Sequence, residues 1–75
     1  MFILYEKQNN KIDMESIVIK SKEEDIRKKM KSSTDLYINY GATIKKEEKN
    51  KTILEWEDGV SFSINIKRII DMEEI

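Results

Sequence analysis

The sequence predicts a small α+β domain in which one helix packs on one face of an antiparallel sheet, in the order β-β-α-β-β-β with an optional short C-terminal helix. Three observations lead to this fold class. Apolar residues occupy most even positions from 36 to 66, which is the alternation of half-buried strands. An Asp-Gly pair at 58–59 marks a tight turn within this stretch. An S-x-x-E helix start lies at 21–24.

The first two elements are predicted to be strands. Residues 2–5 form an apolar, partly aromatic run, which suits a strand covered on both faces or central in the sheet. The asparagine pair at 9–10 tolerates left-handed conformations, so a hairpin turn is expected there. The run 12–20 begins with alternation and ends in three β-branched residues at 17–19, which favour sheet over helix. This change of pattern indicates either a bulge near Ser16 or burial of both faces.

A helix is expected from about 22 to 31. In the capping box at its start, the Ser21 hydroxyl accepts from a free amide and the glutamate three residues later reaches back. Acidic residues at 23–25 and basic residues near the end complement the helix dipole. The apolar stripe consists only of Ile26 and Met30, so this helix docks on the sheet through one narrow ridge.

Three consecutive antiparallel strands are predicted within 34–67. Their last turn is best read as a three-residue loop at 57–59, because this register pairs Trp56 with Val60 and sets every even position against an even partner. Gly59 then occupies the left-handed position of the loop. A two-residue loop would instead set charged residues against core residues.

The remaining connections follow from the same pattern. The first turn of this meander pairs Ile44 with Leu54 across the charged segment 45–51, which is expected as a solvated hairpin tip. After the last strand, the apolar spacing that begins at Ile66 permits a short helix over 67–75, although the same residues allow the strand to continue. Neither a repeat nor a linker interrupts the 75 residues, so a single domain is expected.

The composition excludes several classes of function. The chain has no Cys and no His, which rules out disulfides, thiolate or imidazole nucleophiles and the usual zinc sites. Fourteen basic and fifteen acidic residues give a net charge of −1, so no global field favours nonspecific nucleic-acid binding. The longest apolar runs are far shorter than a membrane span. We therefore expect a cytoplasmic protein without cofactor, metal or membrane contact.

The odd positions of the predicted sheet form an open face that is rich in hydrogen-bonding side chains. Tyr37 is the aromatic residue of the meander that the register directs away from the core, and together with Ile53 it is predicted to anchor a recognition surface. The predicted partner-binding residues are Tyr37, Asn39, Ile53, Glu55, Ser61, Ser63 and Asn65. An ordinary solvated strand face would carry the same residue types.

These features favour a small non-enzymatic protein-binding module. Three acidic residues at 55, 57 and 58 form an acidic corner, but paired carboxylates alone are a weak catalytic signal. The Lys-, Ile-, Asn- and Glu-rich composition without Pro is typical of low-GC bacteria and their phages, so the hypothesis is a phage or mobile-element inhibitor of a larger host defence protein. One alternative is a structural homo-oligomer, such as a homodimer that pairs through sheet edges. The other is a nucleic-acid-binding or regulatory module that uses Lys28, Lys29, Lys31, Lys45, Lys46 and Lys49.

Overall fold

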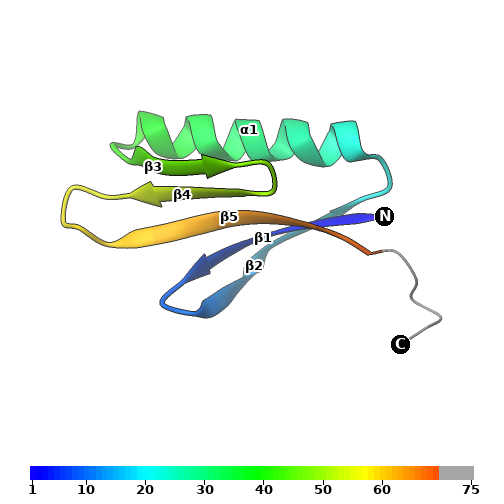
Figure 1. The fold of residues 1–75 in the computed structure, drawn as a ribbon, viewed down its shortest axis with the longest axis horizontal. Helices are drawn as coiled ribbons and strands as arrows, with labels where there is room; N and C mark the ends of the chain where they lie inside the picture. Colours follow the sequence, from blue (N-terminus) through cyan, green and yellow to red (C-terminus); the bar gives the residue numbers. More distant parts are fainter. Residues whose placement is uncertain (70–75) are drawn as a thin grey trace.

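The computed structural model describes residues 1–69 and confirms the predicted α+β fold with its β-β-α-β-β-β order (Figure 1). In chain order the elements are β1 (Phe2–Gln8), β2 (Lys11–Lys20), α1 (Glu23–Asn39), β3 (Thr43–Glu48), β4 (Lys51–Glu55) and β5 (Ser61–Arg68). The short C-terminal helix stays a prediction, because β5 continues to Arg68 and residues 70–75 lie outside the described part of the chain.

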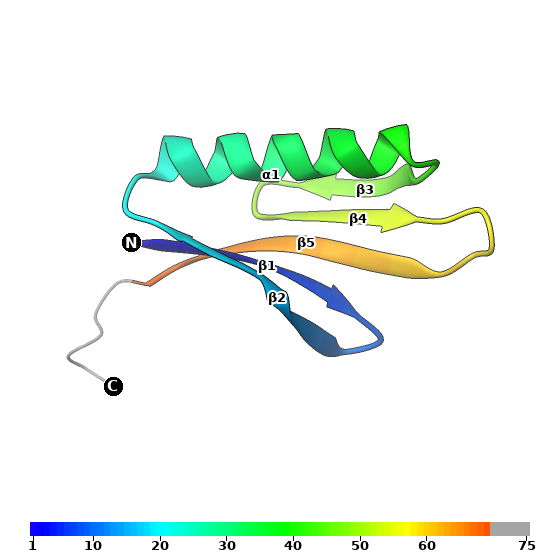
Figure 2. The same cartoon turned by 180° about the vertical axis from the view of Figure 1, so that it is seen from behind.

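The five strands form one antiparallel sheet in the order β2-β1-β5-β4-β3. The last strand along the chain, β5, is therefore the central strand, and β1 lies between β2 and β5. Of the two alternatives predicted for the first strand, the interior position in the sheet is the one confirmed. The helix α1 contacts β1, β2 and β5, and β2 and β3 form the two edges of the sheet (Figures 1 and 2). α1 is too short and too polar to cross a membrane, and residues 1–69 contain no other helix.

The hydrophobic core lies between α1 and one face of the sheet. Half of its buried residues come from the even positions of β4 and β5, as the alternation predicted. They are Leu4, Ile26, Met30, Ala42, Leu54, Phe62, Ile64 and Ile66. Because cross-strand partners share a face, Leu4 of β1 lies on the same side as Ile66, which it opposes. This side of the sheet is therefore the one that α1 covers.

The β4–β5 hairpin has the predicted register. Leu54 faces Phe62, and the amide of Trp56 donates to the carbonyl of Val60 at 2.9 Å. The Gly59 amide donates to the Trp56 carbonyl at 2.9 Å and closes the three-residue loop. Gly59 has φ +88°, a left-handed conformation that costs glycine little because it has no Cβ. The three-residue turn is confirmed.

The β3–β4 hairpin is longer than predicted. Ile44 faces Leu54, as expected, but β3 continues to Glu48, so the charged segment expected as a loop is mostly strand. The turn consists of residues 49–50. A register shift between Ile44 and Lys46 leaves an extra residue in β3, and all six residues of the strand are exposed.

The β1–β2 hairpin confirms the predicted turn at 9–10. Asn9 and Asn10 have φ of +52° and +62°, the pair of left-handed conformations that a two-residue hairpin loop requires. The bulge considered near Ser16 is present, because the register shifts between Leu4 and Glu6. The Ser16 hydroxyl accepts from the Glu6 amide at 2.8 Å and donates to the backbone carbonyl at position 13 at 2.6 Å. These bonds satisfy backbone groups that the bulge removes from the ladder.

The helix is longer than the sequence predicted, and the strand expected from position 34 is wrong. α1 continues to Asn39, and its own residues Ser33 and Thr34 are buried together with Ile26 and Met30. These buried positions follow helical spacing, but two of them are polar, so the apolar stripe seemed to stop at Met30. Thr34 satisfies its hydroxyl by donating to the Met30 carbonyl at 2.8 Å. The alternating apolar residues at 36, 38 and 40 lie exposed at the end of α1.

Both ends of α1 differ from the prediction. The residue at the N-cap position is Lys22, without a side-chain cap hydrogen bond, so the Ser21 capping box is wrong. At the other end, Gly41 has φ +106° and its amide donates to the Ile38 carbonyl at 3.0 Å. The next amide donates to the Tyr37 carbonyl at 3.0 Å, which completes a Schellman motif. Since the helix ends there, the basic residues expected in its last turn lie within its middle.

Candidate functional site

The face of the sheet opposite α1 is the main candidate site. Its members follow from the strand register, since directly opposed residues project to the same side. We call it the uncovered sheet face; its central residues are Ile3, Tyr5, Lys7, Lys51, Ile53, Glu55, Ser61, Ser63, Asn65 and Lys67. Within residues 1–69, no helix or strand packs on this face.

Ser63 and Asn65 form the floor of the uncovered sheet face. Each is only 8% exposed, because β5 is central and its neighbours contribute long side chains, such as Tyr5 opposite Asn65. The Asn65 amide nitrogen donates to the Ser63 hydroxyl at 2.9 Å and lies 3.5 Å from the Tyr5 carbonyl oxygen. These two predicted binding residues are therefore bonded to each other and fix the shape of the floor.

Ile53 and Tyr5 provide apolar surface on either side of this floor. Ile53 on β4 opposes Ser63, Tyr5 on β1 opposes Asn65, and both side chains are half-buried. Next to Ile53, a hollow of about 330 Å³ extends toward the Asn9–Asn10 turn. Tyr5 is a site residue that the sequence analysis missed, because the pairing of β1 with β5 joins the two ends of the chain.

Glu55 and Ser61 form one end of the uncovered sheet face. The Ser61 hydroxyl donates to a Glu55 carboxylate oxygen at 3.3 Å, and the Lys45 ammonium lies 3.4 Å from the same oxygen. Five of the seven predicted binding residues, namely Ile53, Glu55, Ser61, Ser63 and Asn65, thus share the predicted face. The carboxylate of Glu55 is already partly compensated there.

Tyr37 and Asn39 do not belong to this face, so their predicted placement is wrong. Asn39 is the exposed last residue of α1. Tyr37 projects from α1 into the aromatic part of the core, where its ring centroid lies 5.0 Å from that of Phe62 and 6.0 Å from that of Trp56, both in edge-on geometry. The predicted outward direction of Tyr37 depended on a strand that does not form.

The Tyr37 hydroxyl has a specific partner on the sheet. It donates to a carboxylate oxygen of Glu6 at 2.5 Å, which links α1 to β1. Burial, together with this hydrogen bond and the nearby Glu6 charge, raises the pKa of the Tyr37 hydroxyl above its usual value. Tyr37 therefore joins the helix to the sheet through both its ring and its hydroxyl.

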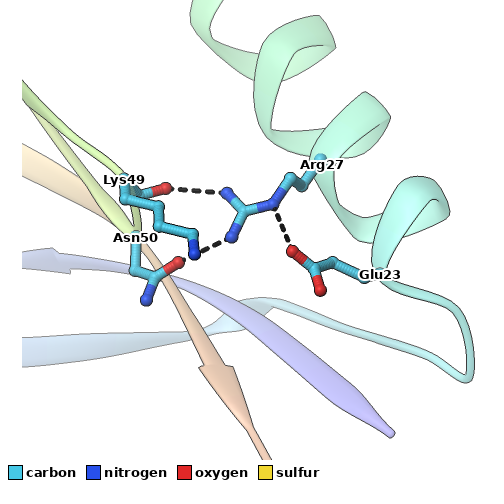
Figure 3. A network of polar contacts seen from close by, with 4 residues as sticks. All are labelled: Glu23, Arg27, Lys49 and Asn50. Carbon is cyan, nitrogen blue, oxygen red and sulfur yellow. Dashed lines mark hydrogen bonds and ion pairs between the residues drawn. The ribbon is translucent and has the colours of Figure 1, made fainter.

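Arg27 forms a second polar link between α1 and the sheet (Figure 3). Its guanidinium donates to the Glu23 carboxylate at 2.8 Å, to the Lys49 backbone carbonyl at 2.7 Å and to the Asn50 side-chain oxygen at 2.8 Å. The hydrogen bond and charge of Arg27 lower the pKa of Glu23. Because three acceptors already surround the guanidinium, this cluster joins the first turns of the helix to the β3–β4 turn.

The six lysines considered for nucleic-acid binding do not gather on one surface. Lys28, Lys29 and Lys31 are exposed along α1; Lys29 borders one hollow, whereas Lys31 and Lys49 line another together with three acidic residues. Lys46 lies 3.2 Å from the Glu48 carboxylate, as Lys45 does from Glu55 at 3.4 Å. This arrangement gives no continuous basic stripe for a phosphate backbone.

The acidic corner is part of a turn, and Glu57 and Asp58 also line a hollow of about 420 Å³ beside Tyr40 and Trp56. Asp58 accepts from the Val60 amide at 3.1 Å, which supports the β4–β5 loop, while Glu57 is exposed. Among residues 1–69, no three acidic, histidine or cysteine side chains are placed to hold a metal ion.

A hollow of about 770 Å³ lies between α1 and β3. Its apolar floor includes Met30, Ile38 and Ile44, and its walls carry basic and acidic side chains in similar number. This mixture of charge gives no preference for an anion or a cation. No protein-family model, curated protein or solved structure matches the chain. The surface chemistry of the fold is therefore the basis for a functional proposal.

Proposed function

We propose that the chain is a non-enzymatic protein-binding module that recognises a larger protein through the uncovered sheet face. The observation that supports this most directly is the combination of apolar Tyr5 and Ile53 with the hydrogen-bonded floor of Ser63 and Asn65. Protein interfaces combine buried aromatic or aliphatic anchors with polar groups whose hydrogen bonds are satisfied. A floor held by its own bonds is also preorganised, which reduces the entropy lost on binding.

The charges around this face indicate the chemistry of the partner. Lys7 and Lys51 flank the floor, since they oppose Ser63 and Asn65, and Lys67 follows on β5. Glu55, the acidic residue among the ten, lies close to Lys45. The partner is therefore expected to present an apolar patch bordered by carboxylates, which would face these lysines.

The chemistry of the chain favours binding over catalysis. It has neither His nor Cys, and its acidic corner supports a turn. Such a module would inhibit a host protein by occupying one of its functional surfaces. This is the mode of action expected of a phage or mobile-element inhibitor.

The test uses affinity capture followed by measurement with a purified partner. Immobilised chain is incubated with lysate of a low-GC bacterium, and the captured protein is then purified and titrated against variants. Tyr5→Ala and Ile53→Ser should each weaken binding by about 2 kcal/mol, as interface anchors do. Leu36→Ser, at a comparably apolar but exposed position on α1, is the matched control and should leave the affinity unchanged.

Two results would contradict this proposal. One is a captured protein whose affinity falls with Leu36→Ser but not with the two face variants. The other is that the same face binds a labelled single-stranded oligonucleotide with steep salt dependence and loses this binding in Lys7→Ala and Lys51→Ala. That second outcome would favour the nucleic-acid alternative.

A further inference from the structure

The two edge strands of the sheet differ in how they are protected against pairing with another strand. β2 and β3 are the edges, and within residues 1–69 no strand lies beyond either of them. The outer part of β3 carries two lysines and two glutamates at 45–48, a common way of protecting an edge. β2 carries three aliphatic residues at 17–19 instead.

Symmetry limits how an edge strand can pair with a second copy of itself. Facing residues of an antiparallel pair project to the same side, while successive residues alternate. A twofold axis between two identical strands must therefore pass between one residue and its own counterpart. For β3 that residue would be a lysine or a glutamate in every register centred within 45–48, so like charges would face each other. The charged part of β3 is thus protected against symmetric pairing centred on its own residues.

The same rule selects one register for β2. With the axis at Val18, Val18 faces its counterpart and Ile17 of each copy faces Ile19 of the other. Moving the axis to Ile17 would set Ile19 against Glu15. Moving it to Ile19 would set Val18 against Lys20. Only the register at Val18 sets aliphatic residues against aliphatic residues throughout 17–19.

The local structure of β2 agrees with this register. The register shift leaves residues 14–17 without a partner on β1, and the strand pairs regularly with β1 from Val18 to Lys20. Ile19 is 54% exposed and would be covered by the second copy. At the ends of the contact, Ser16 of one copy faces Lys20 of the other, so no like charges face each other there.

We propose that a second copy of the chain pairs with β2 about a twofold axis at Val18. The two five-stranded sheets then form one continuous antiparallel sheet in a homodimer. The contact uses the edge of β2 and does not depend on the partner proposed for the uncovered sheet face. It distinguishes β2 from β3 as the edge through which copies associate.

Sedimentation velocity of the purified chain tests the dimer. The wild-type chain should show a concentration-dependent monomer–dimer equilibrium. Ile19→Lys should raise the dissociation constant of the dimer by about tenfold or more, because it disrupts two symmetric aliphatic pairs. Ile44→Lys, at a similarly exposed position on β3, is the matched control and should leave the equilibrium unchanged. A chain that stays monomeric at every concentration, or a dimer abolished by Ile44→Lys alone, would overturn the proposal.

Cysteine cross-linking tests the register, since the natural chain has no cysteine. Facing Cα atoms of antiparallel strands lie about 4.5–5.5 Å apart, within the range of a disulfide. Val18→Cys should form a covalent dimer under mild oxidation much faster than Lys46→Cys, the control on β3. A mixture of Ile17→Cys and Ile19→Cys should give a mixed disulfide, while each variant alone reacts slowly. Equal rates for Val18→Cys and Lys46→Cys would contradict the proposal, and so would a dominant Ile17–Ile17 cross-link.

Discussion

Replacement of Tyr37 measures how strongly the helix is joined to the sheet. The ring makes edge-on contacts with Phe62 and Trp56, each worth about 0.5–1.5 kcal/mol. The hydroxyl donates to the Glu6 carboxylate, and such a charged hydrogen bond contributes about 1.5–3 kcal/mol when buried. Because Tyr37 is only half-buried, we take the lower parts of these ranges. Tyr37→Ala should then cost about 3 kcal/mol and Tyr37→Phe about 1.5 kcal/mol.

Urea unfolding followed by far-UV circular dichroism gives both values, and this signal is independent of the neighbouring Trp56. The chain has 75 residues, so a typical total stability is about 4–11 kcal/mol and both variants should be measurable. Tyr40→Ala is the matched control, because Tyr40 is 71% exposed at the end of the same helix. Tyr40→Ala should change the free energy of unfolding by no more than about 0.5 kcal/mol. Equal values for Tyr37→Ala and Tyr40→Ala would refute the placement of Tyr37 in the core.

The Tyr37 hydroxyl also makes the stability of the fold depend on pH in the alkaline range. Folding raises the pKa of Tyr37, so the fold favours the neutral hydroxyl. This stabilisation is complete below the unfolded pKa of about 10 and is lost as the pH rises toward the folded value. The difference in unfolding free energy between wild type and Tyr37→Phe should therefore shrink above about pH 10. A difference that grows with pH would contradict the hydrogen bond to Glu6.

Two further predictions concern the ends of the helix. Gly41→Ala should cost about 1 kcal/mol or more in urea unfolding, because Gly41 has a left-handed φ of +106° in the Schellman motif, whereas Ser32→Ala on the exposed helix surface should have little effect. An unchanged Gly41→Ala variant would mean that α1 does not end there. In the folded protein Arg27 lowers the pKa of Glu23, so the ionised Glu23 carboxylate stabilises the fold. This stabilisation is present above the unfolded pKa of about 4.3 and is lost as the pH falls through the folded value. Arg27→Gln should lower the urea midpoint at neutral pH, with a difference from wild type that narrows in acid; a constant difference would argue against the ion pair.

The strands and turns could be predicted because their signals are local. The left-handed conformations of Asn9, Asn10 and Gly59 follow from residue type, and the parity of β4 and β5 follows from their apolar alternation. The same parity placed Ile53 and the β5 residues on the correct face. These features depend on neighbours within about ten residues.

The length of the helix, the placement of Tyr37 and the contribution of Tyr5 to the uncovered sheet face could not be derived in the same way. Ser33 and Thr34 occupy buried helix positions without contributing to an apolar stripe, while exposed apolar residues after them imitate a strand. Tertiary packing through Tyr37 overrides that local pattern. Tyr5 was missed because β1 pairs with β5, a contact between the two ends of the chain that no local pattern encodes.

The central claim is that a protein partner binds the uncovered sheet face. An amide and side-chain chemical-shift map of the labelled chain, recorded before and after addition of the purified partner, tests it most directly. The largest changes should fall on Tyr5, Ile53 and the Ser63–Asn65 floor, with small changes along the exposed side of α1. Changes concentrated at Leu36 and Ile38, with the floor residues unaffected, would contradict it.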